Sequence, residues 1–124
     1  MSHKLTWGKT GVHLNHYGVL NVEDLIYALS ELIGHKNIDN IEYLIWDALD
    51  VEVANIDNIT IEISTTFAAN INNLNSTMKV AYIAIDEHLR NMINRYMELN
   101  IVQRPHAKQQ LFNNIDDARE WASS

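Results

Sequence analysis

The sequence contains no cysteine, one proline and four glycines in 124 residues. The absence of cysteine excludes a disulfide framework, a thiol nucleophile and thiolate metal ligands. It also agrees with a reducing compartment. No apolar run approaches the ~20 residues of a membrane-spanning helix, and the N-terminus lacks the apolar core of a signal peptide. We therefore expect a cytoplasmic protein without a membrane span.

Basic residues are also scarce. Nine Lys and Arg stand against sixteen Asp and Glu, which gives a net charge of −7. The basic residues are scattered, so the chain lacks the basic stripe that nucleic-acid binding requires. An acidic domain of this kind is also repelled by anionic membrane surfaces. We expect no nucleic-acid partner.

The remaining composition is that of a globular protein, with 47% apolar and 20% charged residues. The length fits one domain over residues 1–124, without a linker, internal repeat or low-complexity segment. A chain of this size buries roughly two-thirds of its unfolded surface and needs no disulfide or metal for stability.

The first third of the chain predicts a hairpin followed by a helix. Residues 4–7 and 12–19 alternate apolar with polar around a turn containing Gly8 and Gly11, which is typical of a β-hairpin. Asn21 then suits a helix N-cap, and Gly34 suits the C-cap. Between them lies one apolar stripe at helical spacing: Val22, Leu25, Ile26, Leu29, Leu32 and Ile33.

The central third is the stretch around which the fold is organised. Residues 41–47 predict a buried strand, and the acidic residues 47–52 predict a loop after it. Residues 59–63 alternate and are β-branched, so local propensity favours a strand. The same region also carries a helical stripe, and a parallel strand after it requires a crossover. We therefore predict a helix from Asn58 to about Leu74, capped by Asp57 or Asn58.

The last third predicts two more strand–helix units. Residues 78–85 form a strand, Asp86 caps a helix that ends near Asn100, residues 109–112 form a short strand, and Asn114 caps a final helix. The order is ββαβαβαβα. It predicts an α/β fold with a central, mixed but mainly parallel five-stranded sheet and four helices.

At this point the chain resembles the STAS fold, and more narrowly the bacterial SpoIIAA-like proteins, also described as STAS/SEC14-type domains. Short segments spread along the chain carry the resemblance: residues 18–25, 43–47, 79–84 and 111–121. Together they span nearly the whole chain. The resemblance implies an anti-sigma factor antagonist-like module that binds a protein or a ligand.

The resemblance also implies where a switch would lie. Anti-sigma factor antagonists carry an Asp-Ser-Ser-Gly type motif after the central strand, and its serine, at the start of the following helix, is phosphorylated. Phosphate at a helix N-terminus adds charge where a partner docks. Here Asp57 is kept, Asn58 replaces the serine, and the glycine is missing. Thr60 or Ser64 could take the place of the phosphorylated serine only if its hydroxyl is exposed. We expect the module to lack the phospho-serine switch.

The sequence contains no motif typical of a metal site or of a catalytic nucleophile. The acidic group Asp47, Asp50, Glu52 and Asp57 matches no metal-binding loop, and the histidines lack ligand spacing. There is no Gly-x-Ser-x-Gly elbow and no Gly-rich phosphate loop. We therefore expect neither a metal nor a cofactor, and no enzymatic activity.

Two questions concern apolar side chains. Phe67, Met92 and Tyr96 either pack in the core or line a cavity for a small apolar, lipid-like ligand. Trp7 and Trp121 either cover sheet edges or form an exposed patch that favours a homodimer. Trp46, in the central strand, is expected in the core.

We expect a non-enzymatic, regulatory STAS-like module that binds a protein partner through the acidic loop and the following helix start. The candidate binding residues are Asp47, Asp50, Asp57, Asn58 and Thr60. The alternative is a carrier or sensor of a small apolar ligand, with Phe67, Met92 and Tyr96 as candidate contacts.

Overall fold

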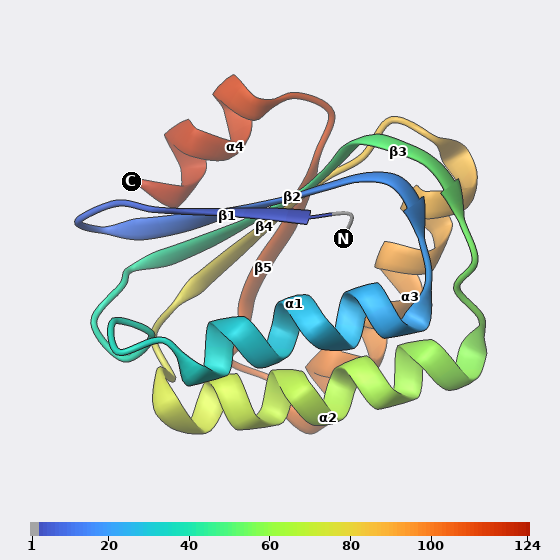
Figure 1. Cartoon of the computed structure of the whole chain (residues 1–124). Helices are drawn as coiled ribbons and strands as arrows, with labels where there is room; N and C mark the ends of the chain where they lie inside the picture. The colour runs from blue at the N-terminus through green and yellow to red at the C-terminus, as the bar shows by residue number, and fades with distance from the viewer. Residues whose placement is uncertain (1–2) are drawn as a thin grey trace.

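The computed structural model describes residues 3–124, except for the side chains of residues 58 and 59. The order of elements is the predicted ββαβαβαβα (Figure 1). Their bounds are β1 His3–Trp7, β2 Gly11–Leu20, α1 Val22–Gly34, β3 Tyr43–Ala54, α2 Asn58–Leu74, β4 Lys79–Ile83, α3 Glu87–Gln103, β5 Lys108–Phe112 and α4 Ile115–Ala122.

The strands form one five-stranded sheet in the order β1-β2-β3-β4-β5. β1 pairs with β2 antiparallel, and the other three pairs are parallel. The predicted mixed, mainly parallel sheet is confirmed. Figure 1 shows α1, α2 and α3 on one side of this sheet and α4 on the other.

The two sides of the sheet carry cores of different size. The larger core joins the sheet to α1, α2 and α3 through residues such as Leu14, Leu32, Trp46, Ile71 and Ile93. The smaller core lies under α4 and contains Ile45, Ala81, Ile83 and Ala118. Within the described chain, no helix combines the length and apolar character needed to cross a membrane.

All four helices begin where the sequence places them. The side chains of Asn21, Asp57, Asp86 and Asn114 each accept a hydrogen bond from the backbone N–H three residues later. α2 has the predicted bounds, so the helical stripe outweighs the strand propensity of residues 59–63. Burial of Ile61 and Ile71 against the other elements decides this, because tertiary packing overrides a weak local preference.

Three predicted boundaries are wrong. α3 runs to Gln103, one turn beyond Asn100. β4 is shorter at both ends than residues 78–85. Gly34 is the last helical residue of α1 rather than a left-handed cap, because the chain leaves the helix through His35 in an extended conformation at φ −81°.

The largest difference concerns the acidic residues 47–52. They were predicted as a loop, but β3 continues through them to Ala54. The reason is that β2 also continues, to Leu20, and its second half pairs with residues 50–54 of β3. The pairing of β2 with β3 depends on backbone hydrogen bonds, so the acidic side chains of residues 47–52 do not reveal it in the sequence.

The three tryptophans have separate environments. Trp46 is buried in the larger core, as predicted. The Trp7 ring stacks on His35 with centroids 3.7 Å apart, and the Trp121 ring packs against Phe112. Both are half-buried, which favours edge covering. The homodimer stays a prediction.

Candidate functional site

β2 and β3 extend past their neighbours in the sheet. β4 pairs with β3 only as far as Asp47 opposite Ile83. Among the described residues, β1 pairs with β2 only as far as His3 opposite His16. Residues 17–20 and 48–54 therefore continue as a two-stranded parallel ribbon, which we call the β2–β3 ribbon. Figure 1 shows it curving towards the start of α2.

The pairing within this ribbon is irregular. The register shifts between Asn15 and Tyr17 and again between Gly18 and Val19. Gly18 has φ +70°, a conformation that other L residues rarely adopt. Extra residues on one strand bend and twist a pair locally, which re-aims the side chains that follow.

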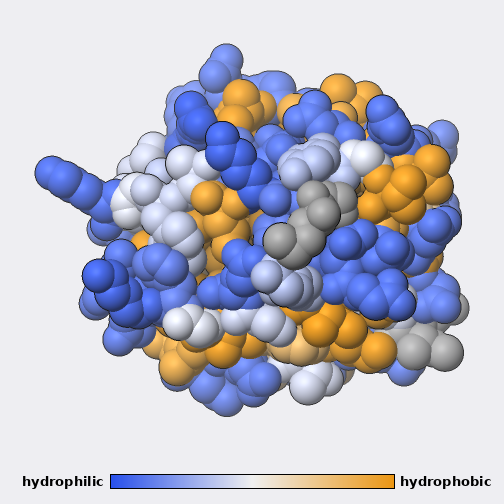
Figure 2. Space-filling view, viewed as in Figure 1, coloured by the Kyte–Doolittle hydropathy of each residue, from blue (hydrophilic) through white to orange (hydrophobic). Residues whose placement is uncertain are grey.

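Apolar side chains are exposed on the outer face of the ribbon. Tyr17, Val19 and Val53 are 42%, 46% and 51% exposed. Tyr17 lies opposite Asp50, and Val19 lies opposite Val53, so these side chains share one face. We call Tyr17, Val19, Asp50 and Val53 the outer patch. Figure 2 shows apolar surface interrupting the polar surface where β3 curves.

Asp47 lies at the base of the ribbon, and its side chain is buried. Its Oδ2 is 2.9 Å from Nε2 of His13, and its Oδ1 accepts a 2.9 Å hydrogen bond from the Leu49 N–H. Burial alone raises the pKa of this carboxyl. The hydrogen bonds to His13 and Leu49 outweigh burial, and the net pKa lies below its usual value. Asp47 thus holds the backbone where the register of β2 and β3 shifts, and it does not present a free carboxylate.

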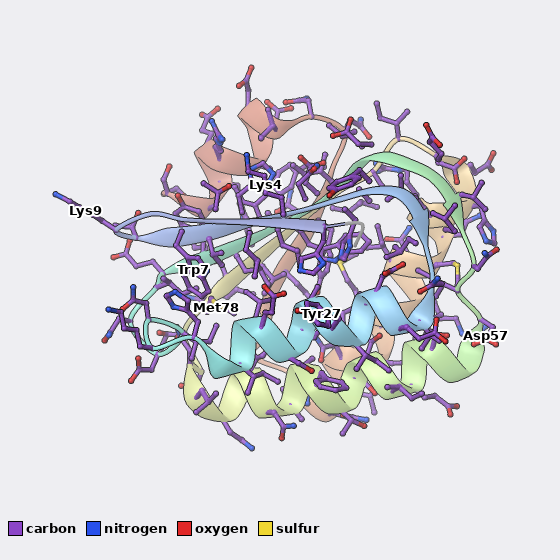
Figure 3. The ribbon with its side chains drawn as sticks, in the orientation of Figure 1. Lys4, Trp7, Lys9, Tyr27, Asp57 and Met78 are labelled. Carbon is purple, nitrogen blue, oxygen red and sulfur yellow. The ribbon has the colours of Figure 1, made fainter. Side chains whose placement is uncertain are left out.

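The start of α2 is closed by its own side chains. Oδ1 of Asp57 accepts 2.9 Å hydrogen bonds from both the N–H and the hydroxyl of Thr60. The Ser64 hydroxyl donates to the Thr60 carbonyl. Thr60 and Ser64 are only 4% and 8% exposed. Figure 3 shows Asp57 at the first turn of α2.

A cavity of about 130 Å³ lies between the sheet and helices α1, α2 and α3. We call it the inner cavity. Side chains from all three helices and from β3 and β4 line it, including Leu29, Trp46, Ala68, Tyr82, Met92 and Tyr96.

One end of the inner cavity is polar. Asn100, Arg104, Lys108 and Gln109 lie there. The Asn100 amide donates to Gln109 at 3.0 Å, and Arg104 donates to the side-chain oxygen of Asn100 and, at 3.4 Å, to the Thr65 carbonyl. Arg104 is half-buried, so the cavity reaches the surface at this end.

Two tyrosines form part of the wall next to that polar end. The Tyr82 and Tyr96 rings meet nearly edge-to-face with centroids 5.9 Å apart, and their hydroxyls are hydrogen-bonded. Burial raises the pKa of Tyr96 to about 12 and that of Tyr82 well above its usual value. Both phenols therefore stay neutral around pH 7.

The structure distributes the sequence-predicted residues over several environments. Asp50 is exposed on the ribbon and accepts a 3.1 Å hydrogen bond from Asn15, while Asp47 is buried below it. Asp57 caps α2. Thr60 is buried beside it, and the Asn58 side chain lies outside the described part. Met92 and Tyr96 line the inner cavity, but Phe67 does not.

Sequence reasoning missed the apolar part of the outer patch and the polar end of the cavity. Tyr17 and Val19 looked like ordinary strand residues, because their exposure depends on where the neighbouring strands stop. Arg104 lies just after α3, and no motif marks it. Within the described chain, no group of three or more His, Asp or Glu side chains is placed to hold a metal ion.

No family model and no curated protein matches the sequence. Solved structures with the same fold are found. An anti-sigma factor antagonist from Mycobacterium paratuberculosis superposes with a TM-score of 0.69 at 16% identity, covering 99% of this chain and 94% of its own. SpoIIAA in its unphosphorylated form gives a TM-score of 0.60 at 8% identity, covering 98% and 97%.

A third structure, of a Thermotoga maritima protein described as an anti-sigma factor antagonist, gives a TM-score of 0.64 at 16% identity, covering 98% of this chain and 95% of its own. The chain therefore has the STAS fold of SpoIIAA-like anti-sigma factor antagonists. At these identities the likeness concerns the fold.

Proposed function

We propose that this protein is a cytoplasmic regulatory module that binds another protein through the outer patch and the adjoining start of α2, without catalysing a reaction. The observation that carries this proposal is the β2–β3 ribbon, where Tyr17, Val19 and Val53 are exposed together. Clustered exposed apolar side chains with a polar surround are typical of protein interaction sites.

The charge around the outer patch suggests the chemistry of the partner. Asp50 and Glu52 are exposed on the ribbon, and Asp57 follows three residues after its end. The whole chain carries −7. A partner with basic residues around an apolar centre fits this surface, because complementary charge steers association. The names of the structural neighbours suggest an anti-sigma factor as the kind of partner.

We further propose that binding does not depend on phosphorylation at α2. Asn58 stands where the resemblance implies a serine, and the hydroxyls of Thr60 and Ser64 are buried and hydrogen-bonded within α2. A kinase would have to open the first turns of α2 to reach either of them. Regulation would then rest on the amount of protein or on a ligand.

Affinity capture with charge-reversed variants tests the main proposal. Asp50→Lys combined with Glu52→Lys should lose the partner that the wild type retains. Glu98→Lys is the matched control, because Glu98 is an exposed acid on α3, away from the ribbon. The captured protein is then purified and its affinity for each variant is measured. Equal affinities for all three chains would falsify the proposed surface.

The inner cavity favours a second candidate function, binding of a small apolar ligand. A volume of about 130 Å³ is close to the roughly 150 Å³ of an engineered cavity that binds benzene. Native mass spectrometry of the gently purified protein would detect a co-purified small molecule. A protein that carries no added mass and takes up no small aromatic compound in solution contradicts this candidate.

A further inference from the structure

The charges around the inner cavity are unlike those of the rest of the chain. Acidic residues outnumber Lys and Arg by sixteen to nine in the sequence. Yet in the described part of the chain no Asp or Glu lines the cavity. Lys108 is one of two charged residues there, but it pairs with Lys79, whose side chain lies against α4 on the other side of the sheet. Arg104 is therefore the cation that faces the cavity, at its polar end.

Arg104 is held at this mouth without a carboxylate. Its hydrogen bonds go to side-chain amide oxygens of Gln103 and Asn100 and to the Thr65 carbonyl. Within the described residues, no Asp or Glu forms an ion pair with it. A guanidinium has five N–H donors and binds carboxylates through two parallel hydrogen bonds. It is therefore placed to meet an anion from outside the chain.

The wall behind Arg104 is aromatic. Trp46 and Tyr82 have ring centroids 6.0 Å apart, and Tyr82 and Tyr96 have centroids 5.9 Å apart. Rings prefer tilted or edge-to-face contacts at such separations, so a further flat ring is well accommodated. The cavity volume is that of about one such ring.

We propose that the inner cavity binds a small aromatic carboxylic acid, with its ring beside Trp46 and Tyr82 and its carboxylate at Arg104. This inference rests on the second candidate function and names the class of ligand. It also gives the module an input that is separate from its outer patch.

Nuclear magnetic resonance titration of the full chain with benzoate, benzamide and toluene tests the proposal. The Trp46 indole resonance should shift, while those of Trp7 and Trp121, which do not line the cavity, should stay. Benzoate should bind about tenfold more tightly than benzamide, because a hydrogen bond to a charged group exceeds a neutral one. High salt should weaken benzoate alone.

Two variants separate the charge from the cavity. Arg104→Gln should reduce benzoate binding to the level of benzamide, and Arg95→Gln should leave it unchanged, because Arg95 is an exposed residue of α3, the helix that ends just before Arg104, and does not line the cavity. Ala68→Leu should fill the cavity and weaken all three probes. Circular dichroism checks that each variant folds. If Arg104→Gln does not fold, the comparison of benzoate with benzamide on the wild type decides.

Equal binding of benzoate and benzamide to the wild type overturns the proposed charge preference but leaves the apolar-ligand candidate standing. Retention of the benzoate preference in Arg104→Gln overturns the role of Arg104. An unmoved Trp46 resonance with all three probes overturns this inference and the apolar-ligand candidate together.

Discussion

The outer patch and the inner cavity are opposite in almost every physical respect. The outer patch exposes valine and tyrosine among acidic side chains on a ribbon. The inner cavity is lined by apolar and aromatic side chains, with Arg104 at its mouth. The two lie on opposite faces of the sheet, because outer-patch residues alternate along β2 with the buried Leu20. The difference teaches that one small sheet can carry two candidate sites whose charged side chains are of opposite sign.

The largest difference should appear in stability. Ile93→Ala removes a buried side chain that lines the inner cavity, so it should lower the free energy of unfolding by about 4 kcal/mol. Val53→Ala in the outer patch should change it by less than about 0.5 kcal/mol. Urea unfolding of both variants measures the contrast. Similar losses would mean that the outer patch is part of the core.

The base of the ribbon should be the acid-sensitive part of the molecule. His16 is 0% exposed, and neither ring nitrogen has a hydrogen-bond partner in the described structure. Burial, helped by the nearby His3, lowers the pKa of His16 from 6.5 to about 4, although Asp24 and Asp47 oppose this. The unfolded chain then binds more protons than the folded chain between pH 6.5 and 4, so stability falls as pH falls through this window.

The difference between 6.5 and about 4 corresponds to roughly 3 kcal/mol. Urea unfolding at several pH values should show this loss in the wild type and in His88→Leu, which changes an exposed histidine. His16→Leu should remove most of it. Protonation of Asp47 acts in the same direction but at lower pH, because its pKa is below the usual value. An unchanged pH dependence in His16→Leu would count against this explanation.

A smaller effect is expected where the ribbon meets α2. Asp57→Ala removes the hydrogen bonds from the N–H and hydroxyl of Thr60 and should cost about 1 kcal/mol of stability. Asp39→Ala, at an exposed acid outside any helix, is the control for the loss of one negative charge. Thermal unfolding compares the two. A loss no greater than that of the control contradicts the capping role.

Substitutions of the two valines of the outer patch should have the smallest effect on stability and the largest effect on partner binding. Val19→Thr and Val53→Thr keep the β-branched shape and remove the apolar surface, so each should change stability by less than about 0.5 kcal/mol. The double variant should nevertheless lose the protein partner in affinity capture. Retained binding would show that the apolar part of the outer patch is not the contact.

The fold could be predicted because its main determinants are local in sequence. Asn21, Asp57, Asp86 and Asn114 mark the helix starts, and the buried strands are continuous apolar runs. The ribbon could not be predicted, because it exists only where β1 and β4 stop pairing. Its acidic residues look like a loop when β2 is not considered beside them.

The candidate sites were predicted in part for the same reason. Asp57 follows from its place after a central strand, and Met92 and Tyr96 follow from a helical stripe. Asp50 was expected in a loop and lies within β3. The anchoring of Asp47 by His13 joins residues 34 positions apart. Likewise, the relation of Arg104 to Trp46 depends on the packing of α3 on the sheet.

Binding of the purified partner at low and at high salt tests the proposed surface most directly. The wild type should bind more weakly as salt rises, since complementary charges are screened. Asp50→Asn combined with Glu52→Gln should bind more weakly at low salt and depend less on salt, while Glu98→Gln should match the wild type. If the Asp50 and Glu52 variant binds like the wild type at both salt concentrations, the ribbon is not where this protein recognises its partner.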